Sequence, residues 1–163
     1  MSVAAIVLAA GAASRYGRPK QRELLPAVLA ALAGSPVDEV VVVAGAHELE
    51  PDGRARLVVA ADWDRGPGAS LRSGLRSLGA EVTHALVVLA DGPELDPRAV
   101  ERIVEHRNDA PVVAASYEGT RSHPVSLARA VWVTVPDDGA RALSPLLVDC
   151  SDLRAPGDVD YPR

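Results

Sequence analysis

Residues 6–26 read IVLAAGAASRYGRPKQRELLP, an apolar run followed by small residues and then by a helical pattern. An apolar run, Ala4–Ala9, ends at Gly11, and small residues then lead to Arg15 and Lys20 before a helical pattern begins. A buried strand that runs into such a loop can present backbone N–H groups to an anion, and the two cations add positive charge. The stretch therefore predicts a loop that binds a nucleoside triphosphate. The alternative is a strand-to-helix turn with solvated basic residues.

Two standard phosphate-binding loops do not fit this stretch. A Walker loop needs a glycine five residues after Gly11, followed by Lys and Ser or Thr, but Tyr16 and Gly17 stand there. The dinucleotide fingerprint needs a glycine where Ala13 stands. The pattern that remains is L-A-A-G-x-x-S-R-x-G-x-P-K, made by Leu8, Ala9, Ala10, Gly11, Ser14, Arg15, Gly17, Pro19 and Lys20.

This pattern closely resembles the signature loop of the MobA-like nucleotidylyltransferases, which include the enzymes that attach CMP or GMP to the molybdenum cofactor. The resemblance implies that Lys20 lies by the α-phosphate and Arg15 by the β- and γ-phosphates. It also implies that Ser14 and the Leu8–Gly11 stretch contact the nucleotide. Ala10 stands where cytidylyl-transferring members carry alanine and guanylyl-transferring members carry glycine, so CTP is the expected substrate.

Composition narrows the class of protein. The chain has 163 residues, of which 48% are hydrophobic and 24% charged, as expected for one soluble domain spanning residues 1–163. A net charge of −5 and 3% aromatic residues argue against nucleic-acid binding. The single cysteine, Cys150, excludes an internal disulfide and a cysteine-based zinc cluster, and we expect it to be buried. No apolar run is long enough to span a membrane and no secretory signal is evident, so a cytoplasmic protein without a membrane partner is predicted.

Short apolar runs alternate with helical patterns along the chain. This alternation predicts a mostly parallel sheet covered on both faces, which is a three-layer α/β/α, Rossmann-like fold. The predicted strands are Ala4–Ala9, Glu39–Val43, Leu57–Ala60, Ala85–Leu89 and Val112–Ala115, and the predicted helices are Glu23–Leu32, Ala69–Leu78 and Pro97–Arg107. Ligands of such sheets bind beyond the carboxyl ends of the strands.

Residues 61–75 form a second candidate ligand-binding loop, because glycines and Trp63 precede a helical pattern that contains Ser70. The segment resembles the family's D-W-x-x-G-x-x-x-S-L-x-x-G-L motif, which holds base and ribose. The resemblance implies nucleotide contacts from Gly66 and Ser70. The alternatives are that Ser70 caps a helix and that Trp63 covers the core, and for Trp63 we favour that second role.

Asp91 follows the apolar run that ends at Leu89, where a buried carboxylate would need a partner. Mg²⁺ bound to a triphosphate would supply one, since this ion takes one or two protein carboxylates together with phosphate oxygens. Asp91 and Pro93 also match the family's D-x-P metal motif. The alternative is that Asp91 accepts hydrogen bonds from turn N–H groups.

Three later segments also resemble the family. Gly119–Val125 resembles G-x-x-G-H-P-V, with Ser122 in place of glycine, and is interpreted as a loop in which His123 either contacts the acceptor or holds the loop. Asp137–Arg141 resembles G-D-x-G-A-R, for which we expect capping and support. At the C-terminus Asp160 matches a D-I-D-T-P motif and is predicted as a second Mg²⁺ ligand, the alternative being an acidic tail. The family's closing helix is missing there, so the resemblance indicates a shortened member.

The sequence therefore predicts a Mg²⁺-dependent enzyme that transfers a nucleoside monophosphate from an NTP to a small phosphorylated acceptor, with release of pyrophosphate. The resemblance makes a molybdopterin-type cofactor the first candidate acceptor. Two alternatives stay open: a non-catalytic nucleotide-binding module, and a protein that uses nucleotide-sugars as glycosyltransferases do.

Overall fold

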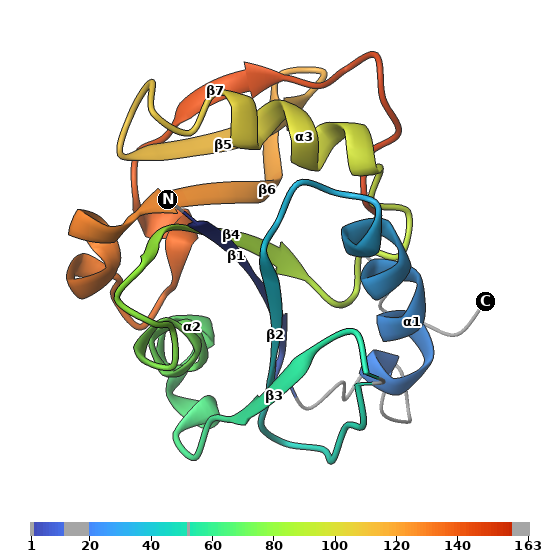
Figure 1. The fold of residues 1–163 in the computed structure, drawn as a ribbon, viewed down its shortest axis with the longest axis vertical. Helices are drawn as coiled ribbons and strands as arrows, with labels where there is room; N and C mark the ends of the chain where they lie inside the picture. The colour runs from blue at the N-terminus through green and yellow to red at the C-terminus, as the bar shows by residue number, and fades with distance from the viewer. Residues whose placement is uncertain (1, 12–19, 52, 158–163) are drawn as a thin grey trace.

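The computed structural model describes residues 2–11, 20–51 and 53–157, which are built around a seven-stranded sheet (Figure 1). The strands are β1 (Ser2–Ala9), β2 (Glu39–Ala44), β3 (Arg56–Val59), β4 (Val82–Leu89), β5 (Val112–Tyr117), β6 (Thr120–Ala128) and β7 (Leu146–Asp149). They lie in the order β3-β2-β1-β4-β6-β5-β7. Strand β6 runs antiparallel to β4 and β5, and the other pairs are parallel. The predicted α/β class with a mostly parallel sheet is confirmed.

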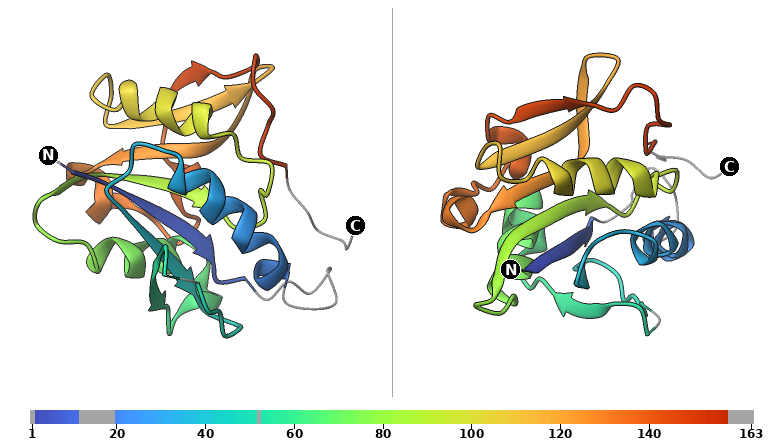
Figure 2. Two further views of the ribbon diagram at one scale, coloured as in Figure 1. Left: turned by 45° about the vertical axis from the view of Figure 1, so that its right-hand side comes forward. Right: turned by 45° about the horizontal axis from the view of Figure 1, so that its top comes forward.

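Helices cover both faces of this sheet, which gives the predicted three layers (Figures 1 and 2). Helices α1 (Lys20–Ala33) and α3 (Pro97–Glu105) pack with one core cluster, and α2 (Pro67–Arg76) packs with the other. Successive residues of β1 alternate between the clusters: Val7 faces α1 and α3, and Ile6 faces α2. Short 3₁₀ segments η1 (Trp63–Arg65), η2 (Arg129–Thr134) and η3 (Ala140–Ala142) complete the α2 side.

Two strands, β6 and β7, were not predicted from the sequence. The segment Gly119–Val125 is predicted to be a loop, and this is wrong, because Thr120–Ala128 forms β6 in the interior of the sheet. Pro124 is misleading in the sequence, since proline donates no hydrogen bond to a ladder. It is tolerated because the β5–β6 pairing shifts register between Ala114 and Ser116, beside the proline. Strand β7 is a short edge strand with half-exposed leucines, so its apolar pattern is weak.

The connection from β2 to β3 is also unusual. These strands are parallel neighbours, and such a connection usually carries a helix. Residues 45–51 and 53–55, which the structure describes, contain no helix. Leu57 and Val59 pair with Val42 and Ala44, two residues of the α1-side core, and they remain exposed. The α1-side face of β3 is thus incompletely covered.

Cys150 is fully buried, as expected for a packing residue. None of the helices in the described ranges combines the length and the apolar character needed to cross a membrane.

Candidate active site

The signature stretch, residues 8–20, begins at the end of β1, and this end of β1 lies beside the end of β4, which Asp91 follows. Strands β1 and β4 are parallel neighbours with Leu8 opposite Leu89, and the Ala90 N–H donates to the Leu8 carbonyl at 3.0 Å. Ala9 and Ala10 are buried, whereas Gly11 is exposed. Because parallel strands end at the same edge, two predicted parts of the site that are far apart in sequence come together here.

Asp91, the predicted metal ligand, lies just after the end of β4. It is half-buried directly beyond β4, and its Oδ1 atom is buried. A hard cation such as Mg²⁺ takes carboxylate oxygens of this kind and completes its shell with water and phosphate oxygens. In the described ranges no cluster of at least three His, Cys, Asp or Glu side chains forms a potential metal site.

Part of the predicted site lies outside the described residues. Ser14, Arg15 and Asp160 lie outside the described residues. Lys20 is the first residue of α1, and its side chain is likewise outside what the structure describes. The first turn of α1 is nevertheless tied to the end of β1, because Gln21 Nε2 donates to the Gly11 carbonyl at 3.1 Å. The N-terminus of a 14-residue helix thus lies beside the signature stretch, where helix N–H groups favour an anion.

A cavity of about 410 Å³ lies at this edge of the sheet, on the α2 side. It brings together Leu8 from the signature stretch, Pro67 from the second loop, and His123 from β6. The remaining lining residues are Val87, Leu89, Arg121, Ser122, Val125, Asp138, Gly139, Ala140 and Arg141. Apolar side chains from the strands line it together with charged groups from β6 and from residues 138–141.

His123 is buried on β6 and does not lie in a loop. The Leu89 N–H approaches its Nδ1 atom at 3.4 Å, and the Tyr117 hydroxyl donates to its carbonyl at 3.2 Å. Burial raises the pKa of Tyr117, so this hydroxyl stays protonated. A Cβ at Gly92 would lie 2.8 Å from both Cε1 and Nε2 of His123. The imidazole therefore occupies the space that a larger residue at position 92 would need, a pairing that the sequence did not reveal.

The second loop and the start of α2 pack closely against residues 135–139. Gly66 has φ +131°, and a Cβ there would lie 2.5 Å from the Asp137 carbonyl oxygen. The Gly68 N–H donates to that oxygen at 2.8 Å. Arg72 donates to the Val135 carbonyl at 2.8 Å and forms a 2.5 Å ion pair with Asp137. The hydrogen bond from Arg72 lowers the pKa of Asp137.

These contacts revise the interpretation of single residues. Gly66 has a packing role, because its φ and the close Asp137 carbonyl both require a glycine. This role does not depend on a nucleotide. Ser70 is buried in α2, whose N-cap is Gly66, so the alternative that Ser70 caps the helix is wrong. Trp63 packs on the core and against Gly45, which confirms its covering role. Asp137 supports the loop as expected, but η3 has Gly139 as N-cap and no side-chain cap, so the expected capping is wrong.

Arg121 has a structural role that the sequence did not predict. Its guanidinium donates to the carbonyls of Ala140 and Leu143, both at 2.7 Å, and of Arg141 at 3.3 Å. Burial lowers its pKa. Arg121 therefore holds the chain that closes one side of the 410 Å³ cavity. No local pattern could indicate this role, because the partners are distant backbone carbonyls.

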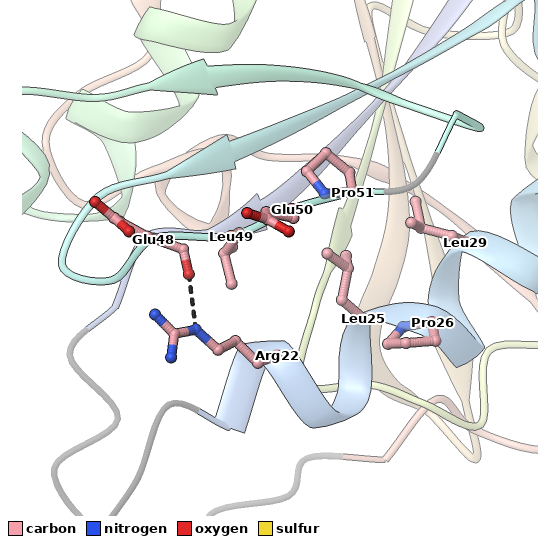
Figure 3. Close-up of a pocket in the computed structure, with 8 residues that line it drawn as sticks. All are labelled: Arg22, Leu25, Pro26, Leu29, Glu48, Leu49, Glu50 and Pro51. Atoms are coloured by element: carbon pink, nitrogen blue, oxygen red, sulfur yellow. Dashed lines mark hydrogen bonds between the residues drawn. The ribbon is translucent and has the colours of Figure 1, made fainter.

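A second cavity, of about 380 Å³, lies between α1 and the connection that follows β2 (Figure 3). Arg22 bridges it, since its Nε donates to the Glu48 carbonyl at 2.8 Å. Leu25, Leu29 and Leu49 supply apolar walls. No residue predicted for the site lines this cavity.

Residues 5–144 match the model of a family described as the MobA-like NTP transferase domain. No curated protein matches the sequence. The match covers the signature stretch, the second loop, Asp91 and His123, so it includes every predicted site residue except Asp160.

Solved structures share the fold at low sequence identity. Rv0371c from Mycobacterium tuberculosis H37Rv superposes with a TM-score of 0.82 at 24% identity, over 99% of this chain and 94% of that one. Rv0371c has also been solved in complex with manganese. A nucleotidyl transferase from Methanothermobacter thermautotroptrophicus, Mth528, gives 0.69 at 22% identity over 85% and 78% of the two chains. The 2-C-methyl-D-erythritol 4-phosphate cytidylyltransferase from Thermus thermophilus gives 0.68 at 18% identity over 91% and 89%.

Proposed function

Because the chain belongs to the family of MobA-like NTP transferase domains, we propose that it transfers a nucleoside monophosphate from an NTP to a small phosphorylated acceptor and releases pyrophosphate. The observation that carries this proposal is the convergence at one edge of the sheet. Leu8 and Asp91 are brought together by the β1–β4 pairing, and Leu8 shares a cavity with His123. This arrangement supports a site in which a nucleotide side and an acceptor side would meet beside a carboxylate.

The reaction needs no covalent intermediate. An oxygen of the acceptor phosphate attacks the α-phosphorus in line and forms a new P–O bond, while the bond to the β-phosphate oxygen breaks and pyrophosphate leaves with the bonding electrons. In this proposal Lys20 stabilises charge on the α-phosphate and Arg15 stabilises the departing phosphates. The stretch Leu8–Gly11, with Gly66 and Ser70, positions the nucleoside.

Asp91 and Asp160 would hold Mg²⁺, which when bound neutralises charge on the triphosphate. The buried Oδ1 of Asp91 and the manganese complex of Rv0371c support a divalent ion in this role. His123 would contact the acceptor from the cavity wall, and a molybdopterin-type cofactor is our first candidate acceptor. The packing of Gly92 on the His123 ring joins this wall to the turn that carries Asp91.

The proposal is tested by thermal melts of Asp91→Asn in EDTA, in Mg²⁺, and in Mg²⁺ with CTP. Asparagine keeps the size and hydrogen-bonding capacity of a turn residue but removes the negative charge that a hard cation needs. We expect the melting temperature in EDTA to match wild type. The stabilisation by Mg²⁺–CTP, which mass action links to affinity, should be lost.

Asp109→Asn is the matched control, because Asp109 is exposed and pairs with His106 at 2.7 Å. It precedes β5, which runs in the same direction as β4, so it lies at the opposite end of the strands from Asp91. It should keep the full ligand-induced shift. An Asp91→Asn variant that gains as much from Mg²⁺–CTP as wild type would refute the metal role. Pyrophosphate release with candidate acceptors then separates an active transferase from a binding module.

A further inference from the structure

Gln21 is an unusual buried residue at the edge where the nucleotide is proposed to bind. It is 5% exposed and is the second residue of α1. Its Nε2 atom donates to the Gly11 carbonyl at 3.1 Å, so the amide lies between the first turn of α1 and the end of β1. Its Oε1 atom is also buried and accepts no hydrogen bond from the part of the chain that the structure describes.

The orientation of this amide is determined by Gly11. Exchanging the nitrogen and oxygen positions would place two acceptor oxygens 3.1 Å apart, which is repulsive. The lone acceptor is therefore Oε1. A buried acceptor without a donor destabilises the ligand-free protein. An apolar residue of similar shape would avoid this, so stability alone does not explain a glutamine here.

The surroundings of the amide suit a ligand. Gly11 is exposed, and a Cβ at this position would lie 3.6 Å from Nε2, in van der Waals contact with the amide. The N-terminus of α1 favours an anion such as a phosphate group. Ionised phosphates carry acceptors only, so the donor for Oε1 must come from another part of the ligand. A triphosphate is accompanied by such a donor, a water molecule on its divalent cation, because Mg²⁺ usually keeps several waters.

We propose that the side-chain amide of Gln21 is part of the ligand site, with Nε2 fixing the end of β1 and Oε1 accepting a hydrogen bond from metal-bound water of Mg²⁺–triphosphate. This inference rests on the proposed function and adds to it a ligand-binding residue at the phosphate end.

The test compares Gln21→Met with wild type in thermal melts and in titrations with two probes, Mg²⁺–inorganic triphosphate and Mg²⁺–CTP. Methionine removes both the bond to Gly11 and the lone acceptor, so the variant in EDTA should be at least as stable as wild type. Its apparent affinity for both probes should fall about tenfold, the factor associated with one hydrogen bond. Ser35→Ala is the control, because it removes a 2.8 Å side-chain bond to the Ala31 carbonyl at the far end of α1. It should leave both affinities unchanged.

Three outcomes would overturn the inference. If Gln21→Met melts lower than wild type in EDTA but binds both probes equally well, the amide is purely structural. If affinity falls for Mg²⁺–CTP alone, the donor belongs to the ribose or base and the assignment to metal-bound water is wrong. If wild type itself binds neither probe, the proposed function fails and this inference with it.

Discussion

Replacing Gly68 by alanine should destabilise the protein, although the same change usually stabilises a helix. Gly68 is the second residue of α2, and its N–H donates to the Asp137 carbonyl at 2.8 Å. A Cβ there would lie 1.6 Å from the Pro136 carbonyl oxygen and 2.8 Å from the Asp137 carbonyl carbon. Both are backbone atoms, so no change of side-chain rotamer can relieve the overlap. The chain at 135–139 must move away from α2.

The expected loss in the free energy of unfolding is the sum of the overpacking and of the hydrogen bonds that this movement weakens. Overpacking of this kind typically costs about 1–3 kcal/mol, and loss of the Gly68–Asp137 hydrogen bond costs about 1 kcal/mol. Displacing Val135 also weakens its bond from Arg72, for about another 1 kcal/mol. The better helix propensity of alanine offsets about 1 kcal/mol. We expect a net loss of about 2–4 kcal/mol in the free energy of unfolding.

The assay is urea unfolding, supported by a thermal melt in which Tm should fall by roughly 5–15 °C for a domain of this size. Gly53→Ala is the control, because no described atom lies within 4 Å of the Cβ it would add, and it should unfold like wild type. If Gly68→Ala is as stable as wild type, the close approach of α2 and residues 135–139 does not exist in solution.

Three further predictions concern pH and specificity. Burial, together with the nearby Arg107 guanidinium, lowers the pKa of His84 from its usual 6.5. As pH falls, the unfolded state therefore binds a proton before the folded state does, and the free energy of unfolding should decline below about pH 6.5. Urea unfolding of His84→Gln at several pH values should show a flatter pH dependence than wild type. Arg72→Met should lower Tm at pH 7. Because Arg72 holds the pKa of Asp137 below 3.8, the difference in Tm between variant and wild type should narrow as pH falls through and below that value. A difference in Tm at pH 3 as large as that at pH 7 would contradict the ion pair. CTP should bind more tightly than GTP, as the alanine at position 10 implies by resemblance, and calorimetric titrations in which GTP binds several-fold tighter would refute this.

The apolar strand pattern predicted most of the fold, because each buried parallel strand has a nearly continuous run of small and β-branched residues. The runs at Ala4–Ala9 and Ala85–Leu89 fall within β1 and β4. Strand β6 could not be predicted in the same way, because Pro124 and its polar neighbours mask the pattern. Its position beside β4 depends on pairing across distant parts of the chain.

The α/β class, the signature stretch and the location of Asp91 at the end of a strand could be predicted from the sequence, because they follow from local periodicity and from the chemistry of single residues. The roles of several glycines and arginines depend on the tertiary structure. Gly68 and Gly92 are required by backbone and imidazole atoms from other segments, and Arg121 and Gln21 bond to carbonyls that no spacing rule identifies. Close packing and hydrogen bonding act between atoms near in space, whatever their separation along the chain, so these roles emerge only when the sheet has brought the segments together.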